Sequence, residues 1–428
     1  MAGLPLEGIR ILDHTIAWAG PQGSVILADL GAEVIKIEAL FRFDGMRYHG
    51  VRFGMSDMFW EKAPWFIQIN HNKLGITLDL SEEKGKELYL KLVKISDVVF
   101  NNFTPRVMPN LGLSYEELLK VKPDIIMVSM PGYGCTGSYK NAPAFGDCIN
   151  AFCGLDEITG YEDSPPMRPG IAYGDPAGGF AAALAVLSAL HFRQKTGQGQ
   201  FVDVSHFEAA TKCMDWTLDC AMNGRVRSRV GNRDDYAAPQ GCYPCKGDDK
   251  WAVISITSDE EWKKFSKLTG HPEWSQDPCF ATAHGRRQHH QELDRLIAIW
   301  TSALDRYEVM DLLQKAGLAG APVLYPGELL EDQHFKSRGF FENVDHPHAG
   351  TRQLPGMVAK MSDSDLRIRF PAPLLGQHNE YAYKELLGLT DQEMADLTEA
   401  GIIGTEPTFA DDRLSATDMD MITKETDK

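Results

Sequence analysis

The sequence predicts an α/β protein with a large domain on a doubly wound, mostly parallel sheet, and a smaller α+β domain. Strand and helix patterns alternate from residue 9 to residue 205, and the polar segment 222–240 separates them from a second group of such patterns. Repeated strand, helix, strand units require a parallel sheet, because each helix carries the chain back across the sheet. Ligands of such sheets usually bind beyond the carboxyl ends of the strands.

Hydrophobic periodicity and capping residues place each element of the large domain. The expected elements are, in order, a strand at 9–12, a helix at 19–31, a strand at 33–38, a strand at 75–80, a helix from its N-cap Ser81 to about Lys94, a strand at 97–103, a helix opened by a capping box of Ser114 and Glu117, a strand at 124–130, a helix from Asp175 to its C-cap Gly197, and a strand at 201–205.

The smaller domain is expected to combine a strand at 251–256 with two helices. Capping boxes of Ser258 with Glu261 and of Asp305 with Glu308 open these helices. The expected boundaries are 1–225 for the large domain, 226–330 for the small domain, 331–403 for a return segment that completes the large domain, and 404–428 for a polar, acidic tail.

Composition narrows the partners and the location. A formal net charge of −17 and a pI near 5.2 argue against binding of nucleic acid or of an anionic membrane, since both need a basic surface. We see no secretory signal and no apolar stretch long enough to span a bilayer, so we expect a cytoplasmic protein. The eight cysteines are expected to be reduced, and Cys242 and Cys245 lack the second ligand pair of a metal site.

A glycine motif follows the predicted strand at 124–130. The segment GYGCTG, residues 132–137, matches G-x-G-x-x-G, but no helical pattern begins inside it, as a dinucleotide site requires. We expect these glycines, Gly134 among them, to let the backbone approach a different ligand closely.

Asp175 stands between a glycine and a proline, directly before a long alanine-rich helix. It suits an N-cap, with Pro176 at the first helical position, and it equally suits a nucleophile. The helix dipole is expected to stabilise its charged form, which can attack an activated acyl group. The small residues Ala177, Gly178 and Gly179 are expected to leave room and free N–H groups for an oxyanion.

Ten segments in order carry a resemblance to a known family. They are LDHTIAWAGP, LGAEVIKIE, NHNKLGITLDL, VVFNNFTPRV, PGYGCTGSY, GDPAGG, KTGQGQFVDVS, YPCKGDDKW, RGFFENVDHP and PAPLLGQHNE, spanning about residues 5 to 403. The chain resembles the class III CoA-transferases of the CaiB/BaiF type, whose best-known member is formyl-CoA transferase. The resemblance implies an enzyme that moves coenzyme A, its cosubstrate, from an acyl-CoA donor to a free carboxylic acid.

The resemblance also implies site residues and a quaternary state. Asp175 occupies the position of the family's nucleophile, which forms aspartyl anhydrides and an aspartyl-CoA thioester. Lys73, Asn102, Phe103 and, with looser spacing, Arg42 match CoA-contacting positions, although a surface cation or a strand-end amide would explain them as well. Trp18, Gly134 and Gly178 are expected in the substrate pocket. Family members form interlocked dimers, and the partner chain is either identical or related.

Departures from the family pattern bear on the substrate. Trp18 replaces a glutamine and Pro131 a lysine of the oxalate-handling member, and its glycine-run lid is absent. The segment 41–66 is rich in aromatic and methionine side chains, which either pack in a core or dimer contact or wall a pocket for a bulky acid. Arg47 or Arg52 would then meet a second carboxylate, as in succinyl-CoA or an arylsuccinate.

Two other functions stay open. Racemases of the same fold carry a histidine general base where this chain has Gly146, followed by Asp147, and the missing base argues against that activity. Alternatively, the chain is a non-catalytic subunit of a heteromeric transferase.

Overall fold

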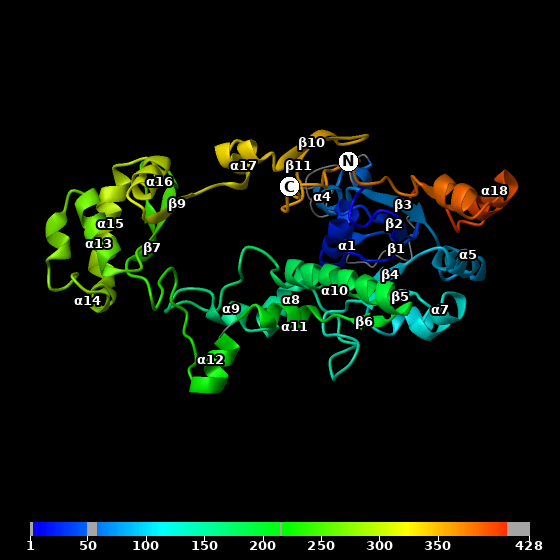
Figure 1. Ribbon diagram of the computed structural model, residues 1–428, viewed down its shortest axis with the longest axis horizontal. Helices are drawn as coiled ribbons and strands as arrows, with labels where there is room; N and C mark the ends of the chain where they lie inside the picture. The colour runs from blue at the N-terminus through cyan, green and yellow to red at the C-terminus, as the bar shows by residue number, and fades with distance from the viewer. Residues whose placement is uncertain (1–2, 49–57, 215, 409–428) are drawn as a thin grey trace, which may run out of the picture. The chain divides into compact units, whose positions relative to one another are not determined.

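The computed structural model describes residues 3–48, 58–214 and 216–408. Arg52 and the tail from residue 409 therefore lie outside the described residues. The chain divides into two compact units (Figure 1). The large unit comprises Met1–Leu155, Arg168–Arg225 and Lys336–Lys428, and the small unit comprises Asp156–Met167 and Val226–Phe335.

A six-stranded parallel sheet forms the centre of the large unit. Its strands are β1 (Arg10–Asp13), β2 (Glu33–Glu38), β3 (Lys73–Thr77), β4 (Val98–Asn101), β5 (Ile126–Ser129) and β6 (Phe201–Asp203). Their spatial order is β3-β2-β1-β4-β5-β6, so the order of strands reverses between β1 and β4. A crevice for a ligand is expected at that switch point, beyond the carboxyl ends of the strands.

Helices cover both faces of this sheet (Figure 1). The large unit holds α1 (Ala19–Asp29), a 3₁₀ turn η1 (Gly45–Tyr48), α3 (Phe59–Lys62), α4 (Pro64–Asn70), α5 (Glu83–Lys94), α6 (Val107–Asn110), α7 (Tyr115–Val121), α8 (Gly146–Phe152), α10 (Gly174–Thr196), α11 (His206–Lys212), α12 (Trp216–Asn223), the antiparallel pair β10 (Phe341–His346) and β11 (Gly350–Pro355), a π-helical turn η4 (Tyr381–Leu386) and α18 (Asp391–Glu399), while α9 (Leu155–Ile158) and α17 (Gln333–Arg338) lie where the chain passes between units.

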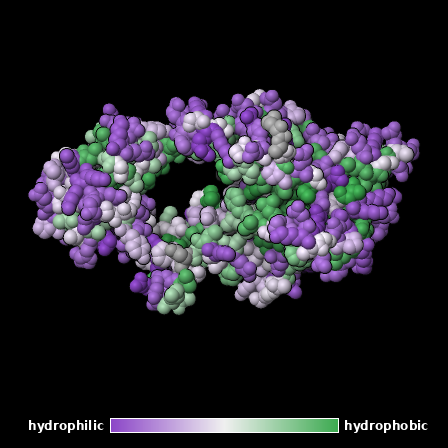
Figure 2. All heavy atoms as spheres, viewed as in Figure 1, coloured by the Kyte–Doolittle hydropathy of each residue, from purple (hydrophilic) through white to green (hydrophobic). Residues whose placement is uncertain are grey.

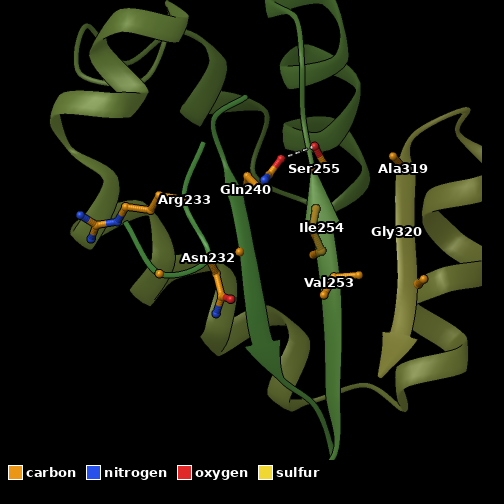
Figure 3. Close-up of a pocket in the computed structure, with 11 residues that line it drawn as sticks. Asn232, Arg233, Gln240, Val253, Ile254, Ser255, Ala319 and Gly320 are labelled. Atoms are coloured by element: carbon orange, nitrogen blue, oxygen red, sulfur yellow. Dashed lines mark hydrogen bonds between the residues drawn. The ribbon is translucent and has the colours of Figure 1, made fainter. Parts of the chain in front are cut away.

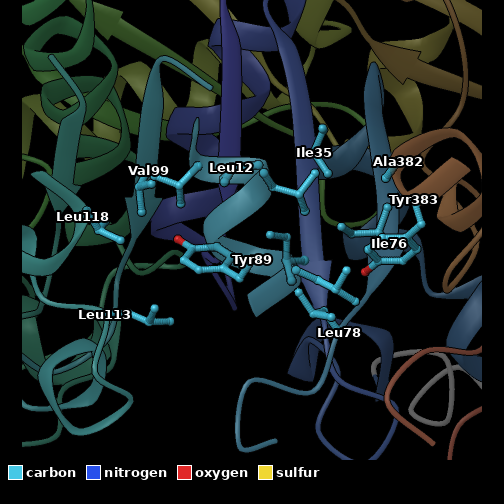
Figure 4. Close-up of a cluster of buried hydrophobic side chains, with 14 of the residues drawn as sticks. Leu12, Ile35, Ile76, Leu78, Tyr89, Val99, Leu113, Leu118, Ala382 and Tyr383 are labelled. Carbon is cyan, nitrogen blue, oxygen red and sulfur yellow. The ribbon is translucent and has the colours of Figure 1, made fainter. Parts of the chain in front are cut away.

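Alternate strand residues serve two cores. In β4, Val98 and Phe100 join a cluster with residues of α1 and α10, whereas Val99 points into a cluster with residues of α5 and α7. Ala382 and Tyr383 of the C-terminal segment pack in this second cluster, beside Ile76 (Figure 4). The segment after residue 336 therefore completes the large unit.

The small unit is built on an antiparallel three-stranded sheet in the order β7-β8-β9. Its elements are β7 (Gln240–Pro244), β8 (Trp251–Ser255), α13 (Asp259–Leu268), η2 (Pro272–Ser275), α14 (Ala283–Gln288), α15 (His290–Ser302), α16 (Arg306–Lys315), β9 (Ala319–Val323) and η3 (Pro326–Leu330). Trp262 and Phe265 of α13 are fully buried in its core. The segment 156–167 belongs to this unit, a grouping that the sequence did not indicate.

Two predicted helix starts are wrong, and the capping box predicted at Ser114 does not form. Asp175 is the second residue of α10, and Tyr173 occupies the N-cap without a side-chain hydrogen bond. The N-cap of α5 is Glu82, one residue after Ser81. Ser114 does cap α7, but its hydroxyl donates to Glu116 (2.7 Å) and no capping box forms. For Ser81 and Ser114, a neighbouring carboxylate, that of Asp79 or Glu116, takes the hydrogen bond of the hydroxyl.

The statement that no apolar stretch can span a bilayer is also wrong by length and composition. Helix α10 has 23 residues and meets the minimum hydropathy of a spanning helix, with a third of that apolar window buried. Its contacts with α1 and with β5 are those of a helix that packs on a sheet. Hydrophobic residues reach the surface of the large unit (Figure 2), and Phe180 and Leu184 of α10 are 53% and 66% exposed.

Candidate active site

Two glycines bring the start of α10 close to the start of α1. A Cβ atom on Gly179 would lie 2.7 Å from the carbonyl oxygen of Ala19, and one on Gly23 would lie 2.9 Å from that of Gly179. The helices therefore meet backbone to backbone, which larger residues would prevent. Asp175, four residues before Gly179, thus lies at the end of the sheet where β1 leads into α1.

The first residue of α8 makes room for the Asp175 side chain. A Cβ atom on Gly146 would lie 2.3 Å from Oδ2 of Asp175 and 2.5 Å from Cβ of Ala172. Asn150, one turn later in α8, accepts a hydrogen bond from the N–H of Gly174 (3.1 Å) and donates one to the carbonyl of Ile171 (3.0 Å). These bonds fix the approach to α10 against α8, so the carboxylate has a defined position.

The electrostatic environment of Asp175 differs from the expectation. Burial, and then the negative charge of Asp147, raise the pKa of Asp175 to about 7. The expected gain from the helix dipole is outweighed, because a half-buried carboxylate loses solvation and a second acid lies close by. Asp147 Oδ1 lies 2.9 Å from a guanidinium nitrogen of Arg168. Among the described residues, the oxygens of Asp175 accept no hydrogen bond, so they are available for attack.

Of the predicted free N–H groups beside Asp175, that of Ala177 is taken. The N–H of Asp175 donates to the carbonyl of Ala172 (3.1 Å), and that of Ala177 donates to Tyr173 (3.2 Å). Pro176 has no N–H to offer. An oxyanion formed at Asp175 must therefore find other donors.

The glycine motif after β5 packs against the start of α11. Gly134 has a φ of +82°, which favours glycine, and the following N–H, that of Cys135, donates to Asp203 at the end of β6 (2.8 Å). The N–H of Phe207 donates to Gly132 (2.9 Å). This loop is thus held by protein groups at the same end of the sheet as the predicted ligands.

His206 is a neighbour of this site that the sequence analysis missed. A Cβ atom on Gly178 would lie 3.1 Å from Cδ2 of His206, so the imidazole packs on the first turns of α10. Burial lowers the pKa of His206 to about 4, and the ring is neutral at pH 7. A signal existed, since the residue follows the N-cap Ser205 directly after a parallel strand.

The loop after β1 lies at the switch point of the sheet. Asn102 accepts a hydrogen bond from the N–H of Ile16 (2.9 Å) and donates one to its carbonyl (2.8 Å), which ties the loop to the end of β4. Trp18 is half-buried and packs edge-on against Trp65, with ring centroids 4.7 Å apart. Phe103 is half-buried. The structure therefore gives the amide of Asn102 a structural role beside the predicted crevice.

The expected contact of the Lys73 side chain with CoA does not fit the structure. Lys73 is fully buried, and its ammonium donates to Asp13 (3.1 Å), Ser24 (2.8 Å) and Asn70 (2.9 Å). With its donors bound inside the protein, the side chain is held in the core.

The two arginines predicted near the substrate lie in different environments. Arg47 is fully buried, with ion pairs to Glu38 (2.8 Å) and Glu61 (2.9 Å), so it cannot meet a second carboxylate. Arg42 is exposed. Phe43 and Phe66 of the aromatic segment 41–66 are buried. For these two residues, burial supports packing in a core and not a role as a pocket wall.

The small unit holds a separate cavity of about 590 Å³ over one side of its sheet (Figure 3). Gln240 and Ser255 in its wall share a hydrogen bond (3.0 Å), and no carboxylate lines it. Within the described part of the chain, no three histidine, cysteine or acidic side chains form a group that could hold a metal ion. Asp175, in the large unit, is therefore the best candidate for covalent chemistry.

The doubly wound parallel sheet, with Asp175 beside its switch point, defines an α/β protein with a candidate catalytic acid. A solved CaiB/BaiF family protein from Brucella suis superimposes with a TM-score of 0.80 at 28% identity, over 90% of this chain and 99% of that one. The sequence model of CoA-transferase family III matches residues 6–379, and the chain belongs to this family.

Two curated relatives come from Chloroflexus aurantiacus. A succinyl-CoA--D-citramalate CoA-transferase is 35% identical over 93% of this chain and 98% of its own. The beta subunit of a succinyl-CoA--L-malate CoA-transferase is 30% identical over 94% of this chain and 98% of its own.

Proposed function

We propose that this CoA-transferase moves coenzyme A from succinyl-CoA, or a similar donor, to a second carboxylic acid through covalent intermediates on Asp175. The observation that carries the proposal is the half-buried Asp175 carboxylate, which has room against Gly146 and no hydrogen bond from the described residues. A carboxylate in this state is poorly solvated and can attack a thioester when ionised.

The reaction balances in four steps. An Asp175 oxygen attacks the thioester carbonyl, a C–O bond forms, the C–S bond breaks, and CoA leaves as a thiolate with an acyl-aspartyl anhydride behind it. The thiolate attacks the aspartyl carbonyl and releases the donor acid as a carboxylate, which leaves an aspartyl-CoA thioester. The acceptor carboxylate displaces the thiolate to form a second anhydride. The thiolate then attacks the acceptor's acyl carbonyl, and Asp175 is regenerated.

The raised pKa of Asp175 favours its role as the nucleophile of this cycle. The attacking form is the carboxylate, about half of which is present at pH 7 when the pKa is about 7. A carboxylate with a raised pKa is a stronger nucleophile than an ordinary one, and burial limits the water that would hydrolyse an anhydride.

The racemase alternative loses support at one residue. A histidine at position 146 would place its Cβ 2.3 Å from Asp175 Oδ2, so the two groups cannot coexist without movement. The trapping experiment in the next paragraph tests the alternative that the chain is a non-catalytic subunit. We also propose that the enzyme is cytoplasmic and that it pairs with an identical or related chain. Arg42 and Phe103 remain candidates for contacts with CoA.

Mass spectrometry of the trapped intermediate tests the proposal. Protein incubated with succinyl-CoA and then hydroxylamine is expected to carry a hydroxamate on Asp175, because hydroxylamine captures anhydrides and thioesters. Formyl-CoA and a branched acyl-CoA serve as alternative donors. The Asp175→Ala protein should carry no label, whereas Asp365→Ala, which changes an exposed acid, should be labelled like the wild type. Labelling of another residue, or of none with any donor, would contradict the proposal.

A further inference from the structure

The ion pair beside Asp175 lacks a well-aligned hydrogen bond. A guanidinium nitrogen of Arg168 lies 2.9 Å from Asp147 Oδ1, yet that oxygen has no hydrogen bond. The distance is right for a charge-assisted hydrogen bond, so the angle must be poor. A guanidinium offers five N–H donors in a planar fork that fits a carboxylate with two parallel bonds. The contact with Asp147 lacks these two parallel hydrogen bonds.

The two side chains are also partly exposed to solvent, although the Oδ1 atom of Asp147 is itself covered. The side chains of Arg168 and Asp147 are 58% and 47% exposed, which contrasts with the sealed ion pairs of Arg47. An exposed ion pair contributes little stability, typically below about 1 kcal/mol, so exchanging its partner costs little. Arg168 can therefore leave Asp147 when a better-aligned carboxylate arrives.

The position of the pair fits a short diacid. Asp147 is the residue after Gly146, whose Cβ position meets Oδ2 of Asp175. Consecutive Cα atoms are about 3.8 Å apart, and the charge of Asp147 is close enough to raise the pKa of Asp175. We therefore expect the distal carboxylate of a short dicarboxylic acyl group on Asp175 to come near the Asp147–Arg168 pair.

The segment that follows Arg168 is held by hydrogen bonds to α8. Asn150 of α8 holds the carbonyl of Ile171, three residues beyond Arg168, and the N–H of Gly174. The chain that carries Arg168 is thus tied to the same helix that carries Asp147. Preorganisation of this kind lowers the cost of binding a charged group.

We propose that Arg168 recognises the distal carboxylate of a dicarboxylic acyl group on Asp175, by exchanging its contact with Asp147 for a contact with the substrate. This proposal rests on the CoA-transferase function proposed above and names its substrate class. It replaces Arg47, whose donors are bound to Glu38 and Glu61. Asp147 then acts as a place-holder that pairs Arg168 while no substrate is bound.

The matched donors for the kinetic test are succinyl-CoA and butyryl-CoA, which differ in a terminal carboxylate or methyl group. Arg168→Gln is expected to lower the ratio of their kcat/KM values by 10-fold to 100-fold in favour of butyryl-CoA, a magnitude typical of a lost bidentate contact. Arg168→Lys should give an intermediate ratio, because charge remains and the fork is lost. The control Arg367→Gln changes another exposed arginine, paired with Asp365, and should leave the ratio unchanged.

A binding measurement separates this proposal from the function on which it rests. In the Asp175→Ala background no transfer occurs, and calorimetry reports affinity alone. In that background, Arg168→Gln should weaken the binding of succinyl-CoA but not that of butyryl-CoA. Asp147→Asn should strengthen the binding of succinyl-CoA. Equal effects on both donors, or no effect on either, would overturn the role of Arg168. Absence of an Asp175 adduct in the wild type would instead overturn the transferase mechanism, and the calorimetric comparison would still decide the role of Arg168.

Discussion

Replacing Asp147 by asparagine tests why the pKa of Asp175 is high. The change keeps the size of the side chain and removes its negative charge. The Asp147 charge raises the pKa of Asp175, so Asp147→Asn should lower it. Because the ionised form attacks, the acidic limb of the profile of kcat/KM against pH, which reports the free enzyme, should move to lower pH.

The structure bounds the size of this movement. The pKa of Asp175 rises from 3.8 to about 7, and burial is the larger of the two causes. The Asp147 charge thus accounts for less than half of the rise, and the limb should move by no more than about 1.5 pH units. A movement of about one unit would increase the ionised fraction at pH 6 from about a tenth to about a half, which is roughly a fivefold gain in rate.

The assay follows transfer of CoA to the acceptor acid by chromatography between pH 5 and pH 9. Asp365→Asn is the control, since it removes an exposed carboxylate that pairs with Arg367. An acidic limb that stays in place in Asp147→Asn, or that moves to higher pH, would refute the electrostatic coupling. A limb that moves by much more than the bound would show that burial is the smaller cause.

Three further predictions concern stability and positioning. Gly146→Ala should lower kcat by about 100-fold, because the new Cβ displaces the Asp175 carboxylate, whereas Gly45→Ala, with nothing within 4 Å, should not; equal activity would contradict the packing. Lys73→Met should cost about 3 kcal/mol in urea unfolding with little change in KM for the acyl-CoA, because buried Asp13 loses its partner, while exposed Lys120→Met should be neutral. The folded-state pKa of Asp175 lies above its ordinary value, so stability falls as the pH rises from about 4 to about 7; Asp175→Asn should raise Tm at pH 8 and not at pH 4, and an unchanged Tm at pH 8 would contradict this.

The sequence predicted the sheet well, because buried parallel strands leave short apolar runs that alternate with helical periodicity. Strands such as Glu33–Glu38 and Ile126–Ser129 fall within their predicted segments. Helix starts were harder, since a capping pattern does not say which neighbour takes the hydrogen bond. Ser81 illustrates this, because its hydroxyl donates to Asp79 and the N-cap is the next residue, Glu82.

The candidate site was predictable in part. Asp175 stood out from the sequence alone, and the resemblance assigned its role. Its raised pKa could not be predicted, because it comes first from burial in the folded chain and then from the charge of Asp147, 28 residues earlier in the sequence. The burial of Lys73 and Arg47 was likewise hidden, since nothing in a lone sequence says which acid a cation will pair with across the fold.

The backbone contact between Gly23 and Gly179 has a consequence for how new specificities arise in this protein. The backbones of α10 and α1 meet at these two glycines, which sets the distance between α1 and the turn that carries Asp175, the proposed nucleophile. Segments such as the one carrying Arg168 can then vary from one descendant to the next and change the preferred acid. Substitution of either glycine by a larger residue would instead displace Asp175 and reduce activity with all acid substrates.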